Sequence, residues 1–180
     1  MHVIIEPLAK FDSTFLDSLA ENIQTVFNYI SDRVYFSYSV KYQQKSLPKL
    51  SYDISKKQYN AELILDKLHF KREDSSMILG IVDVDIWSDP HVFLYGKADV
   101  KKKVAIISLY RLVSQFDQNP QKVMERAVKE SVHELGHLFG LDHCSDTQCV
   151  MIASETVSDI DRKSTFFCPR CVKRLVGINE

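Results

Sequence analysis

The sequence has no excess of charge of either sign and no apolar run long enough to cross a bilayer. Its 23 Lys and Arg are balanced by 24 Asp and Glu, which gives a net charge of −1. This balance argues against a general nucleic-acid surface. No apolar stretch approaches the roughly 20 residues that a membrane-spanning helix needs. We therefore expect neither nucleic acid nor membrane among the partners of the chain.

Internal repeats, low-complexity tracts and a secretory leader are also missing. Residues 1–8 contain no basic stretch followed by a long apolar segment, so we expect a cytoplasmic chain. Cysteine is scarce, with four in 180 residues. Four cysteines allow two disulfides, but a reducing compartment keeps thiols free to bind metal, and this favours a metal site.

The length and composition are those of one small globular domain. A chain of 180 residues with 45% hydrophobic and 26% charged content is long enough to bury a substantial core. We expect a single domain over residues 1–180, in which residues 1–140 form an α/β part and residues 141–180 a smaller C-terminal part. A monomer is the default expectation.

Helical and strand patterns alternate over the first 140 residues and predict an α/β layer with a mixed, mostly parallel sheet. Apolar or β-branched stretches predict strands at residues 2–7, 34–40, 77–84, 92–95 and 104–109. Residues 41–55 indicate a loop. Apolar spacings of three and four predict helices at residues 13–30, capped by Asp12, and at 56–70. Asn119 and Pro120 start a long helix that runs to Phe139, and a short helix is expected within residues 161–176.

The most specific pattern is HELGHLFGLDH at residues 133–143. Residues four apart on a helix differ by about 40° around its axis, so His133 and His137 project side by side and can bind one zinc ion. Glu134 lies about 100° from His133, beside the metal. There it can act as a general base toward a water molecule that the zinc activates.

The third histidine of the pattern needs a break in the helix. On a continued helix, His143 would project about 280° away from His133 and could not join the same ligand set. A left-handed residue at Gly140 turns the chain back and brings His143 to the metal. Three protein ligands with one open position characterise catalytic zinc, whereas four ligands close a structural site.

All four cysteines follow this pattern, as Cys144-x4-Cys149 and Cys168-x2-Cys171. Two chelating pairs of soft thiolates predict a closed tetrahedral zinc site. Such a site would staple a C-terminal segment that has little core of its own. Buried free cysteines are the alternative.

Two further residues or groups near the cysteines allow more than one interpretation. Arg170, Lys173 and Arg174 flank the second cysteine pair and are compatible with a nucleic-acid zinc ribbon, although the neutral chain disfavours it. Met151 lies two residues after Cys149 and could form a hydrophobic floor beneath the metal. A methionine at such a place is also ordinary core packing.

The histidine pattern followed by Met151 resembles the metzincin metallopeptidases. Its continuation into the two cysteine pairs, over residues 133–171, is similar to the archaemetzincin family. The resemblance implies a zincin-like α/β fold, a peptide or protein substrate and two zinc ions per chain. It places a catalytic zinc on the three histidines with Glu134 as base, a structural zinc on the four cysteines, and Met151 in the Met-turn.

One departure and one alternative accompany this resemblance. Some metzincins carry a tyrosine two residues beyond the Met-turn methionine, where this chain has Ala153. Any second electrophile must therefore come from elsewhere in the chain, and the sequence does not identify it. Residues 91–96 are the candidate sheet edge for an extended substrate. The alternative function is a non-catalytic protein that keeps the fold and binds zinc or peptides. Its signature would be a missing Glu134 or third histidine, and both are present.

Overall fold

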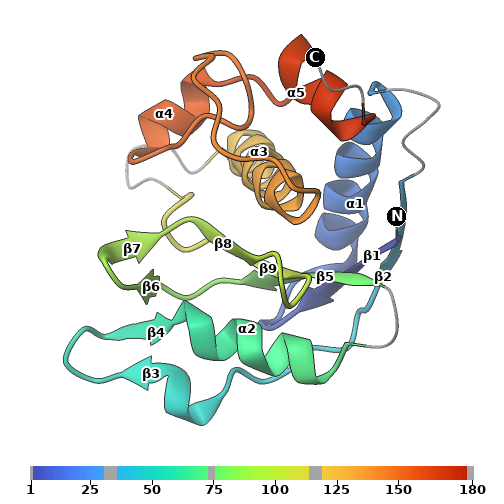
Figure 1. Ribbon diagram of the computed structural model, residues 1–180. Helices are drawn as coiled ribbons and strands as arrows, with labels where there is room; N and C mark the ends of the chain where they lie inside the picture. The colour runs from blue at the N-terminus through green and yellow to red at the C-terminus, as the bar shows by residue number, and fades with distance from the viewer. Residues whose placement is uncertain (1, 31–35, 73–75, 114–118, 178–180) are drawn as a thin grey trace.

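A five-stranded sheet forms the centre of the computed structural model, which describes residues 2–30, 36–72, 76–113 and 119–177 (Figure 1). The strand order is β2-β1-β5-β9-β8. Four strands are parallel, namely β1 (His2–Pro7), β2 (Ser37–Val40), β5 (Met77–Val82) and β9 (Val104–Ser108). At one edge, β8 (Gly96–Asp99) runs antiparallel to β9. The predicted α/β class with a mixed, mostly parallel sheet is therefore confirmed.

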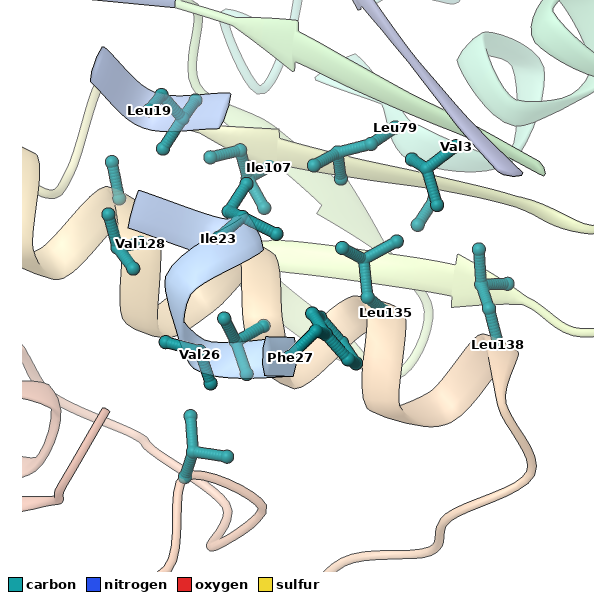
Figure 2. Close-up of a cluster of buried hydrophobic side chains, with 14 of the residues drawn as sticks. Val3, Leu19, Ile23, Val26, Phe27, Leu79, Ile107, Val128, Leu135 and Leu138 are labelled. Carbon is teal, nitrogen blue, oxygen red and sulfur yellow. The ribbon is translucent and has the colours of Figure 1, made fainter. Parts of the chain in front are cut away.

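Helices cover both faces of this sheet. Helices α1 (Ser13–Asn28) and α3 (Pro120–Leu138) lie on one face, and α2 (Ala61–Phe70) lies on the other (Figure 1). The larger hydrophobic core fills the space between the sheet and helices α1 and α3 (Figure 2). On β1, Val3 and Ile5 belong to this core, whereas Ile4 joins a smaller core with α2. Burial on both faces explains the continuous apolar runs of the inner strands.

A second, four-stranded sheet has the order β3-β4-β6-β7. Its strands are β3 (Tyr52–Asp53), β4 (Gln58–Asn60), β6 (Ile86–Ser88) and β7 (His91–Leu94), and a short 3-10 helix, η1 (Lys49–Ser51), precedes them. The expected loop over 41–55 therefore contains η1 and β3, and the helix expected from residue 56 begins only at Ala61. Strands of two or three residues are too short to show a periodic pattern in the sequence.

The longer elements agree with their predicted bounds to within a few residues. The side chain of Asp12 accepts a hydrogen bond from the backbone of Thr14 and caps α1 as expected. For the strand predicted at 34–40, residues 34 and 35 lie outside the described ranges and β2 starts at Ser37. The short helix expected within 161–176 is α5 (Pro169–Leu175), and a further short helix, α4 (Val157–Arg162), precedes it.

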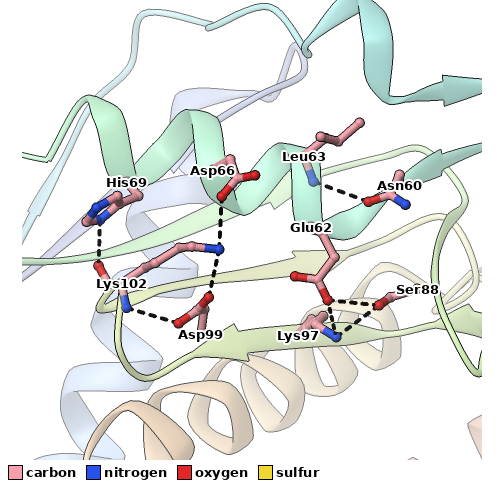
Figure 3. Close-up of polar contacts among 9 residues, drawn as sticks. All are labelled: Asn60, Glu62, Leu63, Asp66, His69, Ser88, Lys97, Asp99 and Lys102. Atoms are coloured by element: carbon pink, nitrogen blue, oxygen red, sulfur yellow. Dashed lines mark hydrogen bonds and ion pairs between the residues drawn. The ribbon is translucent and has the colours of Figure 1, made fainter.

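Polar contacts hold the edge strand β8 against α2 (Figure 3). The ammonium of Lys97 lies 2.8 Å from a carboxylate oxygen of Glu62 and donates to the hydroxyl of Ser88 over 2.9 Å. Lys102 bridges Asp66 and Asp99 at 2.9 Å each and binds the end of the strand to the same helix. Because neighbouring strand residues point to opposite faces, these contacts direct the alternate residues of β8 toward α3.

Among the described residues, none of the helices combines the length and the apolar character that a bilayer crossing requires.

Candidate active site and metal centres

Helix α3 carries the histidine pattern in its last two turns. The side chain of Asn119 accepts from the backbone N–H of Gln121 and caps the helix, as predicted. Gly140 ends the helix with φ of +89°. The backbone N–H of Leu141 then donates to the carbonyl of Gly136 over 3.0 Å, which folds the chain back.

This turn brings His143 to the two histidines of the helix. Its ring centroid lies 5.3 Å from that of His133 and 4.9 Å from that of His137. One ligand nitrogen from each of the three rings lies within 4.8 Å of the others. The Nε2 atoms of His133 and His137 are 3.1 Å apart, and a tetrahedral zinc with bonds of about 2.0–2.1 Å separates its ligands by about 3.3–3.4 Å. The three side chains therefore fit one zinc ion.

Hydrogen bonds fix the tautomers of the two helical histidines. Nδ1 of His133 is 2.8 Å from the carbonyl oxygen of Val150, and Nδ1 of His137 is 2.8 Å from that of Leu141. A carbonyl can only accept, so each Nδ1 carries the hydrogen and each Nε2 presents a lone pair. Two lone pairs 3.1 Å apart repel each other, and a cation between them removes that repulsion.

The same rings are kept neutral by their surroundings. Burial, followed by the charge of Lys163, lowers the pKa of His133 well below its ordinary value of 6.5. Burial also lowers the pKa of His137. A neutral imidazole is the form that binds metal, so both side chains are prepared as ligands.

Glu134 lies next to the edge strand. It is only 5% exposed, and a Cβ atom on Gly96 would be 2.6 Å from its Oε1. Burial, reinforced by the charge of Glu130, raises the pKa of Glu134 well above its ordinary value. A raised pKa makes a carboxylate a stronger base toward a nearby proton.

Met151 packs directly against α3. A Cβ atom on Gly136 would collide with the sulfur of Met151, which is fully buried. The side chain of Met151 therefore packs beside Gly136, the residue before His137. The histidine pattern leaves the residue type at position 136 unspecified, so the sequence gives no signal that Gly136 is needed for packing.

The four cysteine sulfurs form a second cluster, and all lie within 4.8 Å of one another. The Sγ atoms of Cys144 and Cys168 are 3.7 Å apart, as are those of Cys149 and Cys171. A tetrahedral zinc with Zn–S bonds of about 2.3 Å requires a separation of about 3.7–3.8 Å. Each contact joins one cysteine of each pair, so the set fits a closed zinc site.

N–H donors support the thiolate form of Cys144. Arg170 donates to the sulfur of Cys144 over 3.1 Å, and the backbone N–H of Asp146 donates to the same sulfur over 3.5 Å. Burial opposes the thiolate, but the donors outweigh it and lower the pKa of Cys144 to about 7. Deprotonated sulfur is the form that binds zinc.

The two clusters share one stretch of backbone. The N–H of Cys144 donates to the carbonyl of Met151 over 2.9 Å, and the neighbouring carbonyl of Val150 accepts from His133. One segment therefore supplies the third histidine, two cysteines and the partner that orients the first histidine.

Buried charged side chains lie between α3 and α4, and no sequence motif marks them. Arg126 is 3% exposed and binds both carboxylate oxygens of Asp161, at 2.6 and 2.7 Å. Nζ of Lys163 is 2.8 Å from Oε1 of Glu130. The only sequence signal was the position of Glu130, four residues before Glu134 and on the same face of the helix.

The predicted substrate edge, residues 91–96, spans two strands. Residues 91–94 form β7, the last strand of the four-stranded sheet. Gly96 instead begins β8, and this strand touches Glu134. The edge strand beside the candidate base is therefore β8.

Known proteins resemble this chain over most of its length. A model of peptidase family M54 matches residues 9–176. The archaemetzincin of Pyrococcus furiosus is 35% identical over 182 residues, which covers 96% of this chain and 91% of that protein.

Two solved structures share the fold over nearly the whole chain. The crystal structure of archaemetzincin from Methanopyrus kandleri has a TM-score of 0.84 and 31% identity, and covers 97% of this chain and 93% of that one. Archaemetzincin from Archaeoglobus fulgidus, crystallised with malonate, has a TM-score of 0.80 and 32% identity, and covers 97% and 99%.

Proposed function

Because the chain belongs to peptidase family M54, the archaemetzincins, it is a zinc metallopeptidase, and we propose that it hydrolyses peptide bonds with Glu134 as the general base. The ligands of the catalytic zinc in this proposal are His133, His137 and His143. One observation carries it: two imidazole lone pairs converge at 3.1 Å, and a buried carboxyl group with a raised pKa lies on the next residue of the helix.

The chemistry divides between the metal and the protein. Zinc on three imidazoles supplies Lewis acidity, which acidifies water and polarises a carbonyl group. Glu134 accepts the proton that the attacking water loses and delivers it to the leaving amine. Val150 and Leu141 hold the two helical rings in the required tautomer, and the contact with Gly96 limits where the carboxyl group of Glu134 can lie.

The proposal includes a second zinc ion on Cys144, Cys149, Cys168 and Cys171. Its support is the sulfur separation of 3.7 Å in two independent contacts. With four protein ligands this ion has no open position, so its role is to hold the chain.

The substrate in this proposal is an extended peptide that pairs with β8. Three observations support this strand: its place at the end of the sheet order, its antiparallel direction and its contact with the base. An edge strand offers unpaired N–H and C=O groups to a peptide backbone.

The test is Glu134→Gln, assayed on an unbiased peptide library together with zinc content. We expect the variant to keep its zinc and to lose hydrolysis, because an amide cannot accept the proton. Glu125→Gln is a matched control, since Glu125 lies on the same helix and is 57% exposed; it should keep full activity. Full hydrolysis by the Glu134 variant would rule out the proposed base.

A non-catalytic zinc- or peptide-binding protein is the alternative, and the same assay decides it. A zinc-loaded wild-type chain that cleaves no member of the library would favour the alternative. The cytoplasmic location, the monomeric state, the absence of nucleic-acid binding and the division at residues 140/141 stay predictions.

A further inference from the structure

A buried ion pair lies one helical turn before the proposed base. Nζ of Lys163 is 2.8 Å from Oε1 of Glu130, and the two side chains are 0% and 5% exposed. Glu130 is four residues before Glu134 on α3, and Lys163 directly follows α4. The pair therefore joins the C-terminal segment to the turn of α3 that leads into the site.

A buried ion pair is a weak source of fold stability. Taking two charges out of water is expensive, and apolar side chains of similar volume often replace such a pair without loss. Nζ of Lys163 and Oε1 of Glu130 form an ion pair at 2.8 Å, and within the described parts of the chain neither atom has a well-aligned hydrogen bond. The same segments are already joined by the bidentate contact of Arg126 with Asp161.

The two charges act on the site in opposite directions. Glu130 precedes Glu134 by four residues on the same face of α3, so an unpaired charge on Glu130 or Lys163 would lie beside the proposed base. Without the ammonium, the carboxylate of Glu130 would repel that of Glu134 across one helical turn. Without Glu130, the ammonium would be free to pair with Glu134.

We propose that Lys163 and Glu130 are positioning residues for peptide hydrolysis, a matched pair whose mutual neutralisation leaves the carboxyl group of Glu134 free to face the metal site. The inference rests on the proposed function. It assigns no contact with substrate to either residue, and it explains why a charged pair is kept where an apolar one would fit.

The experiment compares a broken pair with a neutral pair. Lys163→Met alone leaves Glu130 buried and unpaired, so both stability and kcat should fall. Adding Glu130→Met should restore the unfolding free energy to at least the wild-type value. KM and zinc content should also match wild type, while kcat stays about 10- to 100-fold low, the usual effect of losing a residue that orients a metal site.

The matched control removes the other charged pair between the same segments. Arg126→Met with Asp161→Asn should lower the unfolding free energy and leave kcat unchanged, because Arg126 lies two turns before Glu134. Lys163→Gln with Glu130→Gln is a second neutral version, in which the two amides can bond to each other.

Wild-type kcat in either folded neutral version would overturn the inference. So would failure of both versions to fold while the control folds, because the pair would then serve stability. The Glu134→Gln variant, assayed in parallel, separates this result from the proposed function. An inactive Glu134 variant beside an active neutral pair refutes only the role of Lys163 and Glu130.

Discussion

Gly96 and Glu134 touch with no side chain between them: a Cβ atom on Gly96 would lie 2.6 Å from Oε1 of Glu134. The edge strand β8 and helix α3 therefore meet at the point where hydrolysis is proposed. Lys97, the next residue along, turns to the opposite face and binds Glu62 of α2 (Figure 3). The contact with α2 holds the strand in place. A side chain added at Gly96 would therefore displace the carboxyl group of Glu134.

The first prediction concerns Gly96→Ala. The added methyl group should displace the carboxyl group of Glu134, and a misplacement of about 1 Å can cost about 100-fold in rate. We expect kcat to fall by about that factor while zinc content is kept. Ala98→Gly, on the same face of the same strand, is the control and should keep kcat. An unchanged kcat in the Gly96 variant would show that the contact is not needed.

The second prediction concerns Gly136→Ala. Alanine favours a helix over glycine by about 1 kcal/mol, but here its methyl group would collide with the sulfur of Met151. Overpacking of this kind costs about 1–3 kcal/mol, so urea unfolding of the zinc-loaded chain should show a net loss. Adding Met151→Val should recover part of it. A variant more stable than wild type would contradict the packing described for Met151.

The third prediction couples the two metal sites. Cys168 is not among the histidine ligands, yet Cys168→Ser should weaken zinc binding at those histidines. The path runs from the cysteine cluster through the hydrogen bond of Cys144 to Met151 and on to Val150, which orients His133. Loss of such support costs about 10- to 100-fold in metal affinity.

Chelator competition, with the two ions counted separately, measures this coupling. Ser145→Ala is the control, because Ser145 adjoins Cys144 but is not one of the four cysteine ligands, and its hydroxyl accepts a hydrogen bond from Arg170. Unchanged zinc affinity at the histidine site in the Cys168 variant would show that the two metal sites are not coupled.

The fourth prediction is the pH dependence of the zinc-free chain. Burial lowers the pKa of His133 and His137 below 6.5 in the folded state. Below that pH the unfolded chain binds protons that the folded chain does not, so this part of the stability is complete above pH 6.5 and is lost as the pH falls. The raised pKa of Glu134 has the opposite sign, since its contribution is lost as pH rises above 4.5.

The measurement therefore uses chelated Glu134→Gln protein. Its unfolding free energy should fall as the pH is lowered below about 6.5. Adding His133→Gln should remove part of the slope. A flat profile in the Glu134 variant would mean that the rings titrate normally in the folded chain.

The sequence predicted those parts of the site that depend on spacing along one segment. His133, His137 and Glu134 are placed by helix geometry alone, and Gly140 signals the turn that returns His143. The bounds of β1 and α3 were also close, because continuous apolar runs and a capped helix are local signals.

The remaining parts depend on segments distant in the chain. The close contact at Gly96 exists because β8 packs against α3. Glu134 lies 38 residues after Gly96 in the sequence, so no local pattern records the contact. Lys163 and Glu130 are paired by the docking of α4, and no local pattern records a partner 33 residues away. The strands β3, β4 and β6 are too short for periodicity and are defined by their neighbours in the sheet.

The hydrogen bonds of His137 to Leu141 and of His133 to Val150 have a consequence for zinc binding during synthesis of the chain. Helix α3 can form as soon as its own residues are available, but His133 receives its orienting partner only from residue 150. Tight zinc binding at the histidines then requires both the helix and the turn beyond it. We expect a ribosome-bound fragment that ends before Val150 to fold much of its sheet and to hold zinc poorly. Zinc would then bind tightly only after the segment that contains Val150 has been synthesised. The peptidase would stay inactive until that point.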